Sequence, residues 1–242
     1  MTDEKVKEIK ALRKAAEDGD VGAQTVLGTM LASGEGDLHD PGEAVTWLLR
    51  AAREGDTTAM FNLGIVYEKG LGTHQDQDEA ALWFWQAAEQ GDNGSRMKLG
   101  TMLLKGQGFS RESPVIKAIE ASADKGNPYA QSFYARLYLD GSGVDQDDAA
   151  AERWFRLAAD QGDESAIFNL GEMMVEGRTM ETSEDEIGNR FFELGTAYLS
   201  EGDLVKAFDC LVSIKRVDPK HFLAQRLEDE IERANQDRMN RT

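Results

Sequence analysis

Histidine is the residue type in this sequence best suited to binding a transition metal, and the chain has three of them. His39 and His74 follow two similar glycine-containing segments at nearly the same position, and Asp40 and Asp76 lie close by in the sequence. Imidazole and carboxylate groups brought together in this way can bind a divalent metal ion. Two isolated histidines are more typical of solvated loops, so we expect no metal site and no cofactor.

A second chemical possibility is nucleophilic catalysis at Ser122. Ser122 and Lys125 have the Ser-x-x-Lys spacing that surrounds the nucleophile of penicillin-recognising enzymes. No Ser-Asp-Asn or Lys-Thr-Gly motif follows to complete such a site. Ser122 also stands where similar segments of the chain have an alanine, which indicates a packing position. We therefore expect no catalytic residues, and a penicillin-recognising hydrolase is the alternative prediction.

The segment that begins at Asp140 has some features of a calcium-binding loop. An EF-hand loop needs glycine at its sixth position and glutamate at its twelfth. Those positions hold Asp145 and Ala151, so the sequence excludes this motif. The Gly-x-Gly pairs of the chain do not indicate phosphate binding either, because they recur at regular intervals as turns do.

These recurring pairs belong to an internal repeat of 35 or 36 residues. One position of the repeat holds Leu27-Gly28, Leu63-Gly64, Leu99-Gly100, Tyr134-Ala135 and Leu170-Gly171. The Gly-x-Gly pairs are Gly34/Gly36, Gly70/Gly72, Gly106/Gly108 and Gly141/Gly143. A large apolar position holds Trp47, Trp83, Ile119 and Trp154. Small residues hold the next position, as Ala51-Ala52, Ala87-Ala88, Ser122-Ala123 and Ala158-Ala159.

Each repeat predicts a pair of antiparallel helices. Residues 57–69 carry apolar side chains at helical spacing, and Gly70 can end that helix in the left-handed conformation. We expect Asp78 to cap a second helix, whose buried face includes Trp83 and the paired alanines. A single pair cannot bury its apolar face alone, so successive pairs must stack.

These motifs resemble the SEL-one-like repeat family, a relative of the tetratricopeptide repeats, over roughly residues 9–177. The resemblance implies an all-α fold, a right-handed α-solenoid of antiparallel helix pairs. We expect a capping helix in residues 1–20 and repeats at 21–56, 57–92, 93–126, 127–163 and, incomplete, 164–183. The third copy departs from the pattern, with Ser95, Ile116 and Ile119 in place of two alanines and a tryptophan.

The pattern changes after Gly177. Ser183 and Glu186 form a capping box, and residues 184–219 then resemble a tetratricopeptide-like repeat. The helix near 184–200 can be the second helix of the fifth repeat, the first helix of this last one, or both. Residues 220–242 should form a capping helix and tail, with an apolar stripe of Leu223, Leu227 and Ile231. The chain should be a monomer or a weak dimer formed through this helix.

The overall charge narrows the class of partner. The formal net charge is -18, which disfavours nucleic acid and anionic membranes as partners.

The single cysteine, Cys210, excludes an internal disulfide, and we expect it to be a small core residue. The first ten residues contain no apolar signal segment. We therefore expect a cytoplasmic protein.

The resemblance implies that the first helices of successive repeats line a concave groove. Seven candidate groove residues are Asn62, Lys69, Lys98, Lys105, Phe133, Arg136 and Asn169. Basic side chains gather here although the chain is acidic, and an asparagine amide can bind a peptide backbone. We therefore predict a non-catalytic scaffold that binds an extended, acidic or carboxylate-ended segment of another protein. Two alternatives stay open: these are ordinary solvated helix positions, or the chain is a structural subunit held through its outer face or termini.

Overall fold

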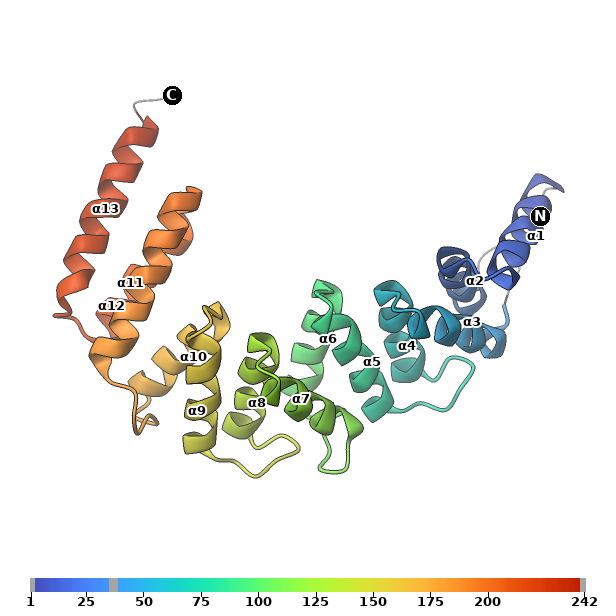
Figure 1. The fold of residues 1–242 in the computed structure, drawn as a ribbon, viewed down its shortest axis with the longest axis horizontal. Helices are drawn as coiled ribbons and strands as arrows, with labels where there is room; N and C mark the ends of the chain where they lie inside the picture. The colour runs from blue at the N-terminus through green and yellow to red at the C-terminus, as the bar shows by residue number, and fades with distance from the viewer. Residues whose placement is uncertain (1–2, 35–38, 240–242) are drawn as a thin grey trace. The chain divides into compact units, whose positions relative to one another are not determined.

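The computed structural model describes residues 3–34 and 39–239, and this part of the chain contains thirteen α-helices and no strand (Figure 1). The all-α fold is therefore confirmed. The chain divides into two compact units, residues 1–121 and 122–242, with α7 running across the division. The helices of the first unit are α1 (Asp3–Glu17), α2 (Val21–Ser33), α3 (Pro41–Arg53), α4 (Thr57–Lys69), α5 (Gln77–Glu89), α6 (Asn93–Leu104) and the start of α7 (Pro114–Asp124). Those of the second are α8 (Pro128–Asp140), α9 (Asp148–Ala159), α10 (Glu164–Val175), α11 (Glu184–Glu201), α12 (Leu204–Val217) and α13 (Phe222–Met239).

Aspartate or asparagine begins the first helix of each repeat. These N-cap residues are Asp20, Asp56, Asp92, Asn127 and Asp163. Each side chain accepts a hydrogen bond from the backbone N–H three residues further on, which satisfies a donor that the helix itself leaves unpaired. In the second repeat the cap of the second helix is Asp76, not Asp78 as expected. Asp76 is extended and accepts from the N–H groups of Asp78 and Glu79, because the helix begins two residues earlier than the expected cap at Asp78 implies.

The two glycines of a Gly-x-Gly pair have different roles. Gly70 ends α4 in the left-handed conformation, with φ of 70°. Gly72 has φ of 72°, and a β-carbon there would lie 2.1 Å from the carbonyl of Pro41 at the start of α3. The loop backbone therefore packs directly on the preceding helix pair. Gly108 makes the equivalent approach to the carbonyl of Gln77, whereas Gly36 lies outside the described residues.

In the first two repeats, the glycine of the Leu-Gly motif lets the two helices of a pair approach closely. A β-carbon at Gly64 would lie 2.5 Å from the ring of Phe84, and one at Gly28 would lie 2.8 Å from Leu48. Side chains at the position of Phe84 are completely buried, namely Leu48, Phe84, Ile119 and Phe155. Ile119 therefore corresponds to Phe84, which is 35 residues before it, and not to Trp83. Trp47 is buried as predicted, but Trp83 and Trp154 are only partly buried at the edge of the core.

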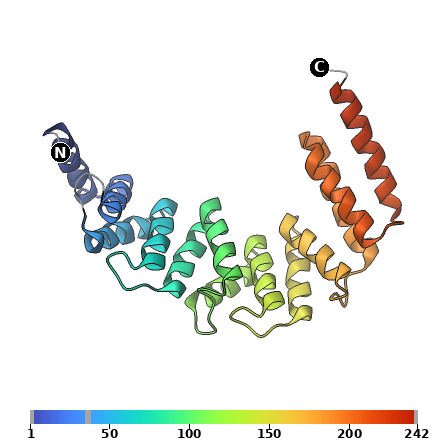
Figure 2. The same ribbon diagram turned by 180° about the vertical axis from the view of Figure 1, so that it is seen from behind.

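The last three helices pack together at the C-terminal end of the second unit, coloured orange to red (Figure 2). Helix α11 contacts α10 and α12: Gly171 of α10 approaches Phe191 as Gly64 approaches Phe84. The predicted stripe on α13 packs inside the chain, because Leu227 is fully buried and Leu223 nearly so. Ile231, the third residue of the stripe, is only partly buried, and the oligomeric state stays a prediction.

Candidate protein-binding surface

The seven predicted groove residues divide between the two compact units. Asn62, Lys69, Lys98 and Lys105 lie on α4 and α6 or at the end of α6, in residues 1–121. The other three, Phe133, Arg136 and Asn169, lie on α8 and α10 in residues 122–242. Six of the seven are on the first helices of their repeats, and Lys105 is the C-cap of α6.

In the first unit, α2 and α4 form a hollow of about 200 Å³. Its lining includes Thr29 and Ser33 from α2, and Asn62, Ile65 and Lys69 from α4. The hollow is therefore built from corresponding positions of two neighbouring first helices. The Nδ2 atom of Asn62 donates to Oγ1 of Thr29 at 2.8 Å. This bond fixes the amide across the two helices and leaves its carbonyl oxygen as an acceptor for a peptide N–H.

The lysines of this unit differ in how far they are already paired. Nζ of Lys98 lies 2.7 Å from Oε2 of Glu68, and it also lies 5.8 Å from the centre of the Phe84 ring. Lys69 and Lys105 are exposed and, within residues 3–34 and 39–239, form no ion pair. Positive charge available to a ligand therefore comes mainly from Lys69 and Lys105.

In the second unit, Arg136 and Asn169 are bound to each other. Nη1 of Arg136 donates to Oδ1 of Asn169 at 3.2 Å, and Nε of Arg136 donates to Asp140 at 2.7 Å. Nδ2 of Asn169 donates to the carbonyl of Ser165 on its own helix. Phe133 is half-buried beside Tyr129, with ring centres 6.1 Å apart. These side chains are ordered by one another, and the charge of Arg136 is largely neutralised by Asp140.

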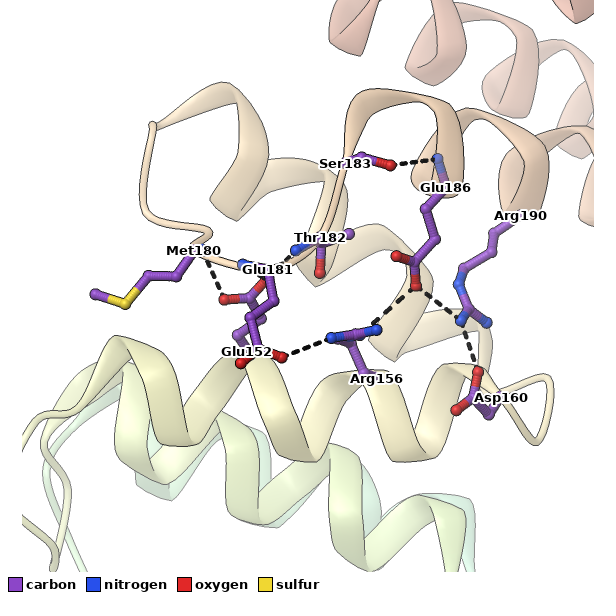
Figure 3. Close-up of polar contacts among 9 residues, drawn as sticks. All are labelled: Glu152, Arg156, Asp160, Met180, Glu181, Thr182, Ser183, Glu186 and Arg190. Carbon is purple, nitrogen blue, oxygen red and sulfur yellow. Dashed lines mark hydrogen bonds and ion pairs between the residues drawn. The ribbon is translucent and has the colours of Figure 1, made fainter.

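Sequence reasoning missed a buried carboxylate, Glu152, that holds the loop between α10 and α11 (Figure 3). Its two oxygens accept hydrogen bonds from the backbone N–H groups of Met180, Glu181 and Thr182, at 2.7, 3.0 and 2.6 Å. Burial acts to raise the pKa of this carboxyl, but the hydrogen bonds outweigh it and hold the pKa below its ordinary value. Glu152 thus acts as a charged anchor for this loop.

Further residues on the same face of α9 extend this anchor. They are Asp148, Arg156 and Asp160, each a multiple of four residues from Glu152. Asp148 binds Arg178 of the loop at 2.5 Å. Arg156 pairs with Glu181 and Glu186, and Arg190 of α11 pairs with Asp160 at 2.6 Å (Figure 3). The signal was present in the sequence, because residue 152 is charged where earlier repeats have Val45, Ala81 and Ile116.

The other residues considered for chemistry are placed as follows. Ser122 is 7% exposed within α7, whereas Lys125 is exposed beyond its end. His74 is exposed and lies 3.7 Å from Asp76. Among the described residues, no group of three or more histidine, cysteine, aspartate or glutamate side chains is arranged to hold a metal ion. Cys210 is fully buried, and burial raises the pKa of its thiol to about 12.

None of the thirteen described helices has both the length and the apolar character that crossing a membrane requires.

The chain is an α-helical repeat protein. Its helices are paired with a period of about 36 residues, and glycines stand at fixed positions in the helix contacts and in the connections between helices. The family model of the Sel1 repeat matches three of its segments, residues 21–56, 57–92 and 128–163. The chain therefore carries Sel1 repeats, as the resemblance to SEL-one-like repeats predicted. The matched segments have the boundaries expected for the first two repeats and begin one residue later in the fourth.

The solved structures that are similar to the chain include the following two. One is a protective antigen present in uropathogenic Escherichia coli strains that displays an SLR fold, with 25% identity and a TM-score of 0.49. That match covers 93% of this chain but 48% of the antigen, so the chain spans about half of that protein's length. The other is a Sel1 repeat protein from Oxalobacter formigenes, with 25% identity, a TM-score of 0.49 and coverage of 100% of this chain and 82% of that one. No curated protein matches the chain in sequence.

Proposed function

We propose that this Sel1-repeat chain is a non-catalytic scaffold that binds a segment of a partner protein along its first helices. The Sel1 repeat itself suggests a protein-interaction role. The observation that carries the finer proposal is the hollow between α2 and α4, where polar and basic side chains of two successive repeats line one depression. Stacked repeats offer such positions at regular spacing, which suits an extended peptide.

The bound segment is acidic or ends in a free carboxylate. Lys69 and Lys105 carry charges that the described part of the chain leaves unpaired. Hydrogen bonds to charged groups contribute roughly 1.5–3 kcal/mol each when shielded from water. These lysines are exposed, so we expect the low end of that range and a loss of affinity as salt screens the charges. Lys98 contributes less, because a ligand carboxylate must compete with Glu68.

The proposal is tested with an array of short peptides that end in acidic residues, each made with a free C-terminal carboxylate and with an amide. Peptides retained by the wild-type protein should bind at least tenfold more weakly as amides. The double substitution Lys69→Glu with Lys105→Glu should reduce their affinity at least tenfold.

The matched control is Lys117→Glu with Lys125→Glu, which makes the same charge change at exposed positions on and just after α7. Both variants should keep the wild-type circular dichroism spectrum and melting temperature. If the two variants weaken binding equally, or neither does, the first helices do not hold the carboxylate and the proposal is wrong.

We propose that the protein acts in the cytoplasm. Its single cysteine is buried, so the protein needs no oxidising compartment to form a disulfide within the chain.

A further inference from the structure

A second surface, at the C-terminal end of the chain, combines exposed apolar side chains with carboxylates. The start of α12 and the last turns of α13 line an open groove with a volume of about 430 Å³. We call it the α12–α13 groove and define it by Leu204, Val205, Phe208, Asp209, Ile231 and Glu232. It is separate from the first helices discussed above, and the argument for it does not depend on the proposed function.

The apolar residues of the groove are unusually exposed. Val205 is 73% exposed and Phe208 is 54% exposed, whereas Leu211 and Ile214 on the same helix are buried. Val212, one turn beyond Phe208, is also exposed. Val205, Phe208 and Val212 lie three and four residues apart, so they form a stripe on one face of the helix. Exposed apolar side chains gathered beside a groove are typical of a protein-interaction site.

The charges at the groove have one sign. Asp209 and Glu232 belong to its lining, and no lysine or arginine does. Lys206 is next to Val205 in the sequence, but its ammonium group lies 4.7 Å from the centre of the Tyr198 ring on α11. Lys215, one turn beyond Val212, is paired with Glu228 of α13 at 2.9 Å. A bound partner would therefore contact apolar side chains that have carboxylates beside them.

We propose that the α12–α13 groove binds an amphipathic helix of a partner protein, with an apolar face flanked by lysine or arginine. A helix lying along two antiparallel helices presents anchors at i, i+3, i+4 and i+7, which matches the spacing of the exposed stripe. Basic residues beside those anchors would meet Asp209 and Glu232. A second copy of this chain is less suitable, because a two-fold contact would bring the same carboxylates against one another in a molecule of net charge -18.

The test uses the full chain and three fluorescent peptides in an anisotropy titration. The first is a 16-residue amphipathic helix with leucine and phenylalanine on one face and lysine on both sides. The second has the same apolar face with glutamate replacing lysine. The third has the composition of the first in a scrambled order that destroys the apolar face. The first peptide should bind at least tenfold more tightly than either of the others.

Protein variants connect that binding to the groove. Phe208→Ser should weaken the first peptide at least tenfold, whereas Met97→Ser should leave it unchanged, because Met97 is an exposed apolar side chain on α6 in the other unit. The double substitution Asp209→Lys with Glu232→Lys should reverse the preference, so that the second peptide binds more tightly than the first.

Equal binding of the first and scrambled peptides, or wild-type binding by Phe208→Ser, would overturn the proposal. So would a dimer of the wild-type chain in analytical ultracentrifugation that Phe208→Ser abolishes, because the occupant would then be a second copy. Binding of the acidic, carboxylate-ended peptides of the previous section is measured independently, so failure of one proposal leaves the other in place.

Discussion

Glu152 shows how a single residue can replace a repeated packing contact with a polar one. Earlier repeats have valine, alanine or isoleucine at its position, and their connecting loops are glycine pairs. In the fifth repeat the loop has Gly177 but no second glycine of the pair, and Glu152 binds three consecutive backbone N–H groups instead. The carboxylate therefore pairs three backbone donors of this loop and attaches the loop to α9.

The substitution Glu152→Gln should destabilise the protein by about 1.5–3 kcal/mol at pH 7, the range for hydrogen bonds to charged groups. The amide can accept at one oxygen only, and its NH₂ group would face a backbone donor. Urea unfolding followed by circular dichroism measures the change. The control is Glu193→Gln, an exposed glutamate of α11, which should alter stability by less than about 0.5 kcal/mol.

The stabilisation by Glu152 should depend on pH in one direction. Because the folded-state pKa of Glu152 is lowered, its contribution is complete above the unfolded-state pKa of about 4.3 and is lost as pH falls through the folded-state pKa. The stability difference between wild type and Glu152→Gln should thus be constant above about pH 5.5 and shrink below about pH 4. A difference that grew on acidification would contradict the assignment of Glu152 as a bound carboxylate.

At the scale of the helix, the glycine of the Leu-Gly motif lies against a side chain of the paired helix in the second repeat but not in the third. A β-carbon at Gly64 would lie 2.5 Å from the Phe84 ring, but one at Gly100 would meet nothing within 4 Å. Both glycines are inside helices and belong to the same Leu-Gly motif. The third repeat has Ile119 where the second has Phe84, and no side chain lies close to Gly100.

This difference gives a prediction with an internal control. Gly64→Ala should destabilise the protein by roughly 1–3 kcal/mol, because the ring must move in a filled core. Gly100→Ala should leave stability unchanged or raise it by up to about 1 kcal/mol, the helix propensity gained by alanine. The melting temperatures of the two variants test this prediction. Equal destabilisation would show that the motif glycine is required for a reason other than contact with the side chain opposite it.

The sequence predicted the helix pairs well because their signals repeat. The period, the Leu-Gly motif and the glycine ends recur, so each copy supports the others. The sequence did not predict which of two adjacent aromatic residues faces the core. Trp83 and Phe84 differ in their angular position around the helix, and only packing shows that Phe84 is the fully buried one. The sequence also failed for Glu152, whose partners are backbone groups about thirty residues away and carry no residue-type signal.

For the candidate groove, the sequence identified helix positions but not their pairing. Two of the predicted residues, Asn62 and Lys69, line one hollow together with Thr29. The sequence did not show that Lys98 and Arg136 are paired with Glu68 and Asp140, because such pairs depend on side-chain conformations. The positive charge available to a ligand is therefore smaller than the number of lysines and arginines in the groove suggests.

At the scale of the whole molecule, stability should be distributed between two compact units that have separate cores. Phe84 lies in the unit of residues 1–121 and Phe155 in the unit of residues 122–242, and both are fully buried. Each contacts mainly its own and adjacent helix pairs, as is general in repeat proteins.

We therefore expect Phe84→Ala and Phe155→Ala each to cost about 3–5 kcal/mol locally, from lost burial and a cavity. In hydrogen-exchange mass spectrometry, Phe84→Ala should increase exchange mainly in α4 and α5, and Phe155→Ala mainly in α8 and α9. Equal loss of protection along the whole chain in both variants would instead show a single cooperative unit.

The approach of Gly72 to Pro41 has a consequence for how such a chain can lengthen during evolution. Gly108 makes the same approach to Gln77, so these two connecting loops each contact the start of a helix in the copy before them. A tandem duplication of residues 57–92 would supply both halves of every such junction, and neither neighbour would have to change. An in-frame duplication of such a repeat therefore keeps the contact between each of these loops and the helix that precedes it.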